Sequence, residues 1–281
     1  ASVEGTKIAV LGIDQVGHGT RRGTSDAKPE NVFFNFANPA AARGNVLQGA
    51  ADQMALVRFA RGLTLPSGSS PTGQEIKLDR VAFWGHSQGM TEGSIAMPYV
   101  EGVAGALFSG AGASLLDSLL TKKSPVNLVA LAPAILSESP ANITSSHPVL
   151  AMLQNGIDPA DPLDHAGAIV GSGALGKHVF VPYGQNDTYS TPITQLTYVA
   201  AAGLAVAQHP PSVTTPDSLI KAPVPIPVTA NAAGGLTAVV RQYAPADFDG
   251  HFVVFRDATA KTDADRFLVD AVNGVVPRIG R

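Results

Sequence analysis

The chain has no cysteine in its 281 residues and little charge, since Asp, Glu, Lys and Arg together make up 15% of it. Without cysteine, the chain has no disulfide, no thiol nucleophile and no cysteine-ligated metal. A net charge of −3, no basic block and only 6% aromatic residues give no support to nucleic-acid binding. No apolar run reaches the roughly 18 residues that a membrane-spanning helix needs. Yet 45% of the residues are hydrophobic, so the chain can bury a sizeable core. Its length suffices for one large α/β domain or two small ones.

Short apolar runs alternate with helical patterns along the chain, which predicts an α/β fold with a mostly parallel, doubly wound sheet. Strands are expected at residues 7–13, 80–84, 103–108, 177–182 and 236–243. Helices are expected at 39–62, where Asn38 and Pro39 form a start signal, at 90–97, at 192–208, and from about Thr262, where Asp265 completes a capping box. Loops are expected at 20–38 and 64–74, and the six prolines between 209 and 228 predict a long surface connection.

A G-x-S-x-G pentapeptide, Gly85-His86-Ser87-Gln88-Gly89, lies between a predicted strand and a predicted helix. A serine hydroxyl is a weak nucleophile, so it must be exposed, beside a base and near donors for an oxyanion. A tight turn exposes it, and glycines at the two ends remove side chains that would collide. The alternative is a structural turn serine in a glycine-rich chain, but strand, turn and helix together favour a nucleophile elbow.

Chemistry in parallel sheets lies at the carboxyl ends of the strands. Ser87, Asp187 and His251 each follow a predicted strand, in the order serine, acid, base. Asp117 is an alternative acid because it also follows a predicted strand, and Asp249 is expected only to tune or cap the loop of His251, as is Asp247. The other six histidines do not follow the last strand: His18, His86, His147, His165, His178 and His209.

Two further patterns admit a cofactor or a metal. The glycine-rich turn from Asp14 to Gly19 looks like a dinucleotide loop, but the next glycine is Gly23, so the G-x-G-x-x-G spacing is not met. Asp158, Asp161 and Asp164 gather beside His165, but their proline-rich spacing fits neither an EF-hand nor a two-metal centre. A tight turn and a capped turn are favoured, so we expect neither cofactor nor metal.

With the elbow, Asp187 and Gly250-His251 in this order, the chain resembles an α/β-hydrolase of the serine esterase and lipase type. The resemblance implies that Ser87 attacks an ester carbonyl, that His251 carries the proton, and that Asp187 fixes the histidine. It also implies that the backbone N–H of Gln88 is one oxyanion donor. The same triad would serve an amidase or an acyltransferase. A non-catalytic binding or structural subunit of a larger hydrolase assembly is the alternative from another class.

The resemblance divides the chain into three parts. Residues 1–110 form the first part of the core with the elbow, 111–176 a helical cap or lid insertion, and 177–281 the second part of the core with the acid and the histidine. The cap is rich in Ala, Leu and Val, which indicates an apolar acyl pocket and a small-molecule or lipid ester as substrate.

The chain departs from the family at its beginning. The family places three strands and a helix before the strand that ends in D-x-x-G-x-G, and this chain begins almost at that strand, with no signal peptide at Ala1. We therefore expect a second polypeptide, in a heterodimer, to supply these strands and the second oxyanion donor. The alternative is a shortened sheet in which amides around Gly17 to Gly19 replace that donor. Few lysines, no cysteine and many Thr, Pro and Gly favour a secreted or cell-envelope location.

Overall fold

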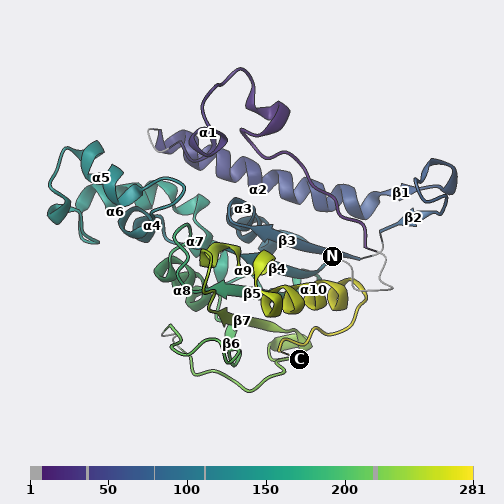
Figure 1. Cartoon of the computed structure of the whole chain (residues 1–281). Helices are drawn as coiled ribbons and strands as arrows, with labels where there is room; N and C mark the ends of the chain where they lie inside the picture. The colour runs from purple at the N-terminus through teal and green to yellow at the C-terminus, as the bar shows by residue number, and fades with distance from the viewer. Residues whose placement is uncertain (1–7, 36–37, 79, 111, 218–220, 281) are drawn as a thin grey trace.

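A five-stranded sheet lies at the centre of the computed structural model, which describes residues 8–35, 38–78, 80–110, 112–217 and 221–280. The strand order is β3-β4-β5-β7-β6, and every neighbouring pair is parallel (Figure 1). The strands are β3 Val81–His86, β4 Val103–Ser109, β5 His178–Gly184, β6 Ala205–Val206 and β7 Ala238–Tyr243. This confirms the predicted fold class. The three central strands are almost wholly buried, as continuous apolar runs in a parallel sheet require.

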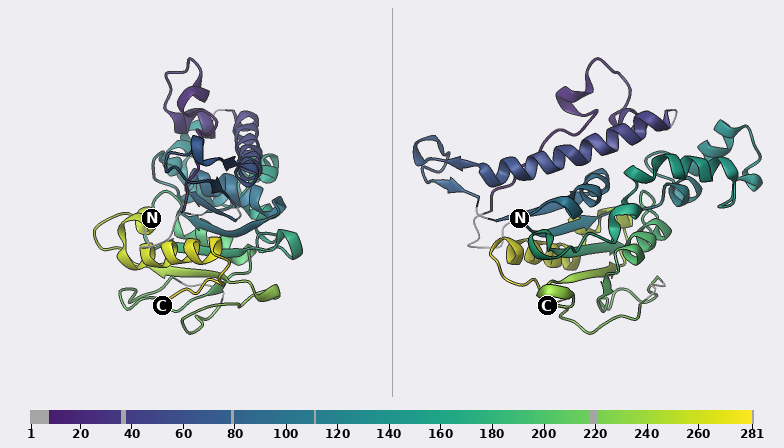
Figure 2. Two further views of the ribbon diagram at one scale, coloured as in Figure 1. Left: turned by 90° about the vertical axis from the view of Figure 1, so that its right-hand side faces the viewer. Right: turned by 180° about the vertical axis from the view of Figure 1, so that it is seen from behind.

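Helices cover both faces of the sheet (Figure 2). On one face, α2 (Pro39–Gly62) packs on α3 (Gln88–Ala96), which contacts β3 and β4. An apolar cluster around Phe108 and Tyr198 fills that layer, and Tyr198 comes from α8 (Pro192–Ala201). On the other face, α9 (Val253–Arg256) and α10 (Ala258–Val272) pack on the sheet, with Phe267 at the centre of a second cluster. Among the described helices, none is long and apolar enough to cross a membrane.

Of the two predicted helix starts, the one at Pro39 is confirmed and the one at Thr262 is not. The Asn38 side chain accepts a hydrogen bond from the backbone N–H of Ala41 at 3.1 Å, and α2 runs from Pro39 to Gly62 as predicted. The C-terminal helix, however, begins at Ala258 and not at Thr262, so that prediction is wrong. Asp257 is the actual cap, with Oδ1 accepting from Ala260 N at 2.8 Å. A good capping residue one turn earlier therefore outcompetes the predicted capping box.

The strand predicted at residues 7–13 is also wrong over the part that is described. Ile8 to Ile13 pair with no other described segment, and residue 7 lies outside the described residues. Val10 is 89% exposed, and Leu11 and Ile13 are each 42% exposed. A strand needs a neighbour for its backbone N–H and C=O groups. In the described sheet, β3 is an edge strand that pairs only with β4, but residues 8–13 do not pair with its free edge.

Three smaller differences concern two segments that were expected to be loops throughout and one that was expected to be a single helix. Residues 20–38 contain a helix, α1 (Pro29–Phe34), and the loop after α2 contains an antiparallel pair, β1 (Thr64–Leu65) with β2 (Ile76–Lys77). The helix expected at 192–208 stops at Ala201, because Gly203 takes a left-handed φ of 66°. The chain then adds the short strand β6 beside β7.

Between β4 and β5 the chain forms four helices instead of continuing the alternation: α4 (Leu115–Thr121), α5 (Leu128–Leu136), α6 (Pro148–Ile157) and α7 (Pro162–Ala166). In Figure 1, α4, α5 and α6 lie together beyond the sheet. Helix α4 contacts both α5 and α6, and α6 also contacts α2. This is the segment predicted to be a cap, although residue 111, its expected boundary, lies outside the described residues.

Asp161 connects this insertion to the end of β4. Its Oδ1 accepts hydrogen bonds from the backbone N–H groups of Ser114, at 2.9 Å, and Leu163, at 3.0 Å. Its Oδ2 accepts from Leu115 N at 2.7 Å and from the Gln154 amide at 2.9 Å. The aspartate cluster is thus built as a capped turn, and the described residues contain no group of three or more acids and histidines placed to hold a metal ion.

A buried ion pair holds α10 against β7, and its loss is expected to destabilise the fold. Arg241 is 4% exposed and Asp263 3% exposed, and Asp263 also accepts from the Tyr243 hydroxyl at 2.7 Å. We expect Asp263→Ala to lower the free energy of unfolding by about 3–5 kcal/mol, because it leaves a buried guanidinium without its partner. Urea denaturation measures this. The double variant Arg241→Met/Asp263→Leu should be less destabilised than the single variant, and equal losses would contradict the assignment.

Candidate active site

The turn between β3 and α3 has the geometry that a nucleophile elbow needs. Ser87 has φ 53° and ψ −116°, a strained conformation for a residue with a side chain. Gly85 permits the turn, because a Cβ there would lie 2.5 Å from the carbonyl oxygen of Gly89. The strand therefore enters the helix directly, with Ser87 at its tip and only partly buried.

Gln88 is the first residue of α3, and its backbone N–H reaches no acceptor among the described residues. The neighbouring N–H of Ser87 is already used, since it donates to the Ser109 carbonyl at 2.9 Å. Unpaired N–H groups at a helix start carry partial positive charge and favour an anionic oxygen. The predicted oxyanion donor is thus free at the first turn of the elbow helix.

Asp187 and His251, predicted from their positions after β5 and β7, lie in direct contact. His251 Nδ1 and Asp187 Oδ2 are 3.0 Å apart, and their side chains are 3% and 0% exposed. Asp187 Oδ2 also accepts from the Gln195 amide at 3.0 Å. Its Oδ1 accepts from the backbone N–H groups of Tyr189, at 2.8 Å, and Ser190, at 2.7 Å. The carboxylate is therefore fixed by hydrogen bonds to both oxygens, with one of them directed at the imidazole.

The two loops that carry this pair touch through their backbones. A Cβ on Gly184 would lie 1.9 Å from the Gly250 carbonyl oxygen, and a Cβ on Gly250 would lie 2.0 Å from the Gln185 carbonyl oxygen. Asp249 adds a second connection, because its Oδ1 accepts from His251 N at 2.9 Å and from Thr188 N at 3.2 Å. Asp249 thus caps the histidine loop, as predicted, and also binds the acid loop.

His251 lies beside the elbow. Its ring centroid is 4.7 Å from that of His86, the residue before Ser87. Gly110, after β4, leaves room for both rings, since a Cβ there would lie 2.7 Å from His251 Cε1 and 3.1 Å from His86 Cε1. Within the described residues, no hydrogen bond joins the Ser87 hydroxyl to His251. Such bonds are often long in structures without substrate and tighten when substrate is bound.

Two aromatic neighbours of His251 could not be identified from the sequence. Tyr189 stacks on the histidine ring, with centroids 4.4 Å apart and planes 13° apart. His86 lies 4.7 Å away, and its Nδ1 is 2.9 Å from the Ser109 hydroxyl. Burial, and secondarily the charge of His251, lower the pKa of His86 to about 3. His86 is therefore neutral near pH 7 and packs against His251 without adding a second positive charge.

Two buried polar groups support the site from outside. Glu92, fully buried in α3, accepts hydrogen bonds from the side chains of Gln53 at 2.8 Å and Gln88 at 3.3 Å, and burial raises its pKa. It thus connects α2 to Gln88, the first residue of α3. On the other side, Lys122 donates to the Tyr189 carbonyl. Burial lowers the pKa of Lys122 to about 8, although nearby Asp187 raises it.

The alternative acid and bases have other partners. Asp117 Oδ2 accepts from the Thr197 hydroxyl at 3.5 Å and not from His251. His147 pairs with Glu138, His165 with the Tyr99 hydroxyl, and His178 with the backbone N–H of Thr237. The three residues Ser87, Asp187 and His251 thus remain the set that the carboxyl ends of β3, β5 and β7 hold in one region.

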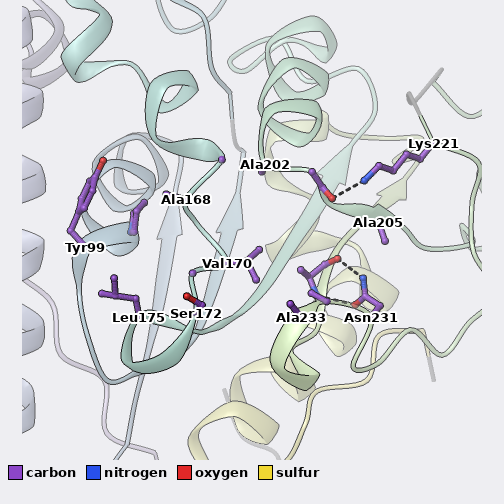
Figure 3. A pocket seen from close by; sticks show the side chains of 16 residues that line it. Tyr99, Ala168, Val170, Ser172, Leu175, Ala202, Ala205, Lys221, Asn231 and Ala233 are labelled. Atoms are coloured by element: carbon purple, nitrogen blue, oxygen red, sulfur yellow. Dashed lines mark hydrogen bonds between the residues drawn. The ribbon is translucent and has the colours of Figure 1, made fainter.

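The larger of the described pockets, of about 660 Å³, lies elsewhere (Figure 3). It is lined largely by small side chains, including Ala205 and Ala238 at the beginning of β6 and β7, so it opens at the opposite edge of the sheet from His251. Its polar groups are engaged, since Lys221 donates to the Gly203 carbonyl at 2.8 Å and Asn231 to that of Ala238 at 2.9 Å. This pocket offers no converging catalytic groups.

No protein-family model matches the chain, and no curated protein sequence matches it. Among solved structures, a mutant of puromycin hydrolase in complex with PGG is similar at 13% identity and a TM-score of 0.41. The match covers 84% of this chain and 27% of that hydrolase, so this chain spans about a quarter of the length of its structural neighbour. Similarity this low identifies neither a family nor an activity.

The low pKa of His86 gives the protein a specific acid sensitivity. Burial lowers its pKa from the ordinary 6.5 of a histidine to about 3 in the folded protein. Between these values the unfolded chain binds more protons, so the stability that neutral His86 contributes is complete above pH 6.5 and is lost as the pH falls toward 3. We expect urea unfolding of the His86→Gln variant to depend less on pH in this window than that of the parent protein. Identical pH slopes would contradict the burial of a neutral His86.

Proposed function

We propose that the chain is a serine hydrolase that cleaves carboxylic esters through an acyl-enzyme on Ser87. The observation that carries this proposal is the buried hydrogen bond between Asp187 and His251, placed beside a serine in a strained turn. Burying a carboxylate and an imidazole together is costly unless each satisfies the other. Serine, histidine and aspartate held in this order are the groups that acyl transfer requires.

In the proposed reaction, Ser87 Oγ attacks the ester carbonyl and His251 Nε2 accepts its proton. The Nδ1–H group donates to Asp187, which fixes the tautomer and stabilises the imidazolium. The N–H of Gln88 donates to the developing oxyanion. The imidazolium then protonates the leaving alcohol, and the same histidine activates the water that releases the acid from Ser87.

An ester is favoured over an amide by the chemistry of the leaving group. An alcohol leaves more readily than an amine, so ester cleavage needs less stabilisation of the tetrahedral intermediate. One identified oxyanion donor, Gln88, suits the easier reaction, because each donor contributes roughly 100- to 1,000-fold in kcat. Amide hydrolysis and transfer to another alcohol would use the same residues.

Covalent labelling and substitution test this function. A fluorophosphonate probe is expected to modify Ser87 in the folded protein. Ser87→Ala should abolish hydrolysis of p-nitrophenyl esters, and His251→Ala should lose nearly as much, because triad residues act as a unit. Ser146→Ala, the same change at an exposed cap position, is the control and should behave like the parent. If folded protein gives no adduct on Ser87, the chain is instead a non-catalytic binding subunit.

We further propose that a second polypeptide adds strands beside β3 and supplies the second oxyanion donor. Two features support this. The described sheet ends at β3, which is a parallel edge strand, and the extended apolar segment from Ile8 to Ile13 pairs with no described strand. Within this chain, one alternative donor is the Gln15 amide nitrogen, which lies 3.6 Å from the place of a Cβ on Gly89 at the end of the elbow. Gly19 lies against the Asp14 carboxylate, since a Cβ there would be 1.8 Å from Asp14 Oδ2.

Native mass spectrometry of the active material separates these two sources. A second polypeptide is expected to accompany the 28.8 kDa chain. A sole species of that mass with full esterase activity would overturn the two-chain proposal. In that case Gln15→Leu should lower kcat by roughly 100-fold or more, the usual effect of losing one donor.

A further inference from the structure

The insertion between β4 and β5 encloses a pocket of about 110 Å³ whose lining residues are all apolar. Leu115 and Leu119 come from α4, Leu131 and Ala132 from α5, and Leu150 from α6, while the amino-terminal half of α2 closes the remaining side with Val46. No charged or polar side chain of the described residues lines it. A ligand in this pocket is therefore held by apolar contact alone.

Two segments connect this pocket to the candidate active site. Leu115 follows Gly110 by five residues, and Gly110 lies against His251. Five residues span at most roughly 18 Å. On the other side, Val46 lies about 4.5 Å along α2 from Gly49, and a Cβ on Gly49 would lie 2.5 Å from the Glu92 carboxyl group on the elbow helix. Helix α2, which forms one wall of the pocket, thus also packs on the elbow helix α3, and the chain that enters α4 starts beside His251.

We infer that this pocket receives the acyl chain of the ester, and that the substrate class is esters of short to medium unbranched fatty acids. This inference rests on the proposed serine hydrolase. With every lining residue apolar, a charged or polyhydroxylated group would lose its water without any hydrogen bond in return. An alkyl chain gains from the same transfer.

The size of the pocket sets the length of the chain. A water molecule occupies roughly 30 Å³ and a methylene group is of similar size, so the pocket holds on the order of four methylenes. The acyl groups that fill it have about four to six carbons. Each methylene that enters raises kcat/KM about fourfold, so hexanoate esters, with four more methylenes, are cleaved on the order of 100-fold faster than acetate esters or more.

A pair of matched substitutions on α5 tests the inference. Ala132 lines the pocket and is 6% exposed, whereas Ala134, two residues later, is exposed and outside it. In Ala132→Phe, the ratio of kcat/KM for p-nitrophenyl hexanoate to that for the acetate is expected to fall at least about tenfold. In Ala134→Phe the ratio stays at its parent value. If both variants keep the parent ratio, the acyl chain binds elsewhere and the inference is overturned.

A second variant and a binding measurement complete the test. Leu119→Ala enlarges the pocket and should move the preferred ester toward longer chains, which tests the inference if Ala132→Phe does not fold. Calorimetry with hexan-1-ol separates the pocket from the catalytic proposal, because it needs no reaction. Binding by the parent protein and by Ala134→Phe, but not by Ala132→Phe, supports the pocket even if Ser87 proves unreactive. No binding by the parent together with an unchanged chain-length profile overturns the inference.

Discussion

The hydrogen bond between Asp187 and His251 is the constraint on which the arrangement of the site depends. A buried carboxylate is tolerated only where its oxygens are satisfied, and Asp187 receives two backbone N–H groups, the Gln195 amide and the imidazole. These donors come from the loop after β5, from α8 and from the loop after β7. Moving any one of these elements would leave the charge partly unsatisfied, so the sheet, α8 and the histidine loop are held together.

The serine belongs to a second, separately supported unit. Its strained backbone is set by β3 and α3, and Glu92 connects α3 to α2 through Gln53. The rings of His86 and His251 are where the two units meet. This division explains how Ser87 and His251 come to lie in one region although no hydrogen bond joins their side chains in the described structure.

That Ser87, Asp187 and His251 lie in one region could be predicted from the sequence, because parallel strands bring their carboxyl ends to one edge of the sheet. Helix α2 could be predicted because Asn38 and Pro39 act locally. The exposed segment from Ile8 to Ile13 could not, because an apolar run becomes a strand only beside a partner. The stacking of Tyr189 on His251 and the bond from Gln53 to Glu92 join residues far apart in the chain, and no local pattern encodes such contacts.

The contact between Gly184 and Gly250 has a consequence for how this site can be altered. The two loops meet backbone to backbone, with no side chain between them whose size could be varied. Repacking of the core leaves their separation unchanged, and any residue larger than glycine at either position pushes them apart. The spacing of acid and base is therefore not a quantity that gradual substitution can adjust. The separation of the two loops changes only when one of them gains or loses a residue. Substitutions in this fold therefore alter the residues around Asp187 and His251 and leave the distance between the two loops unchanged.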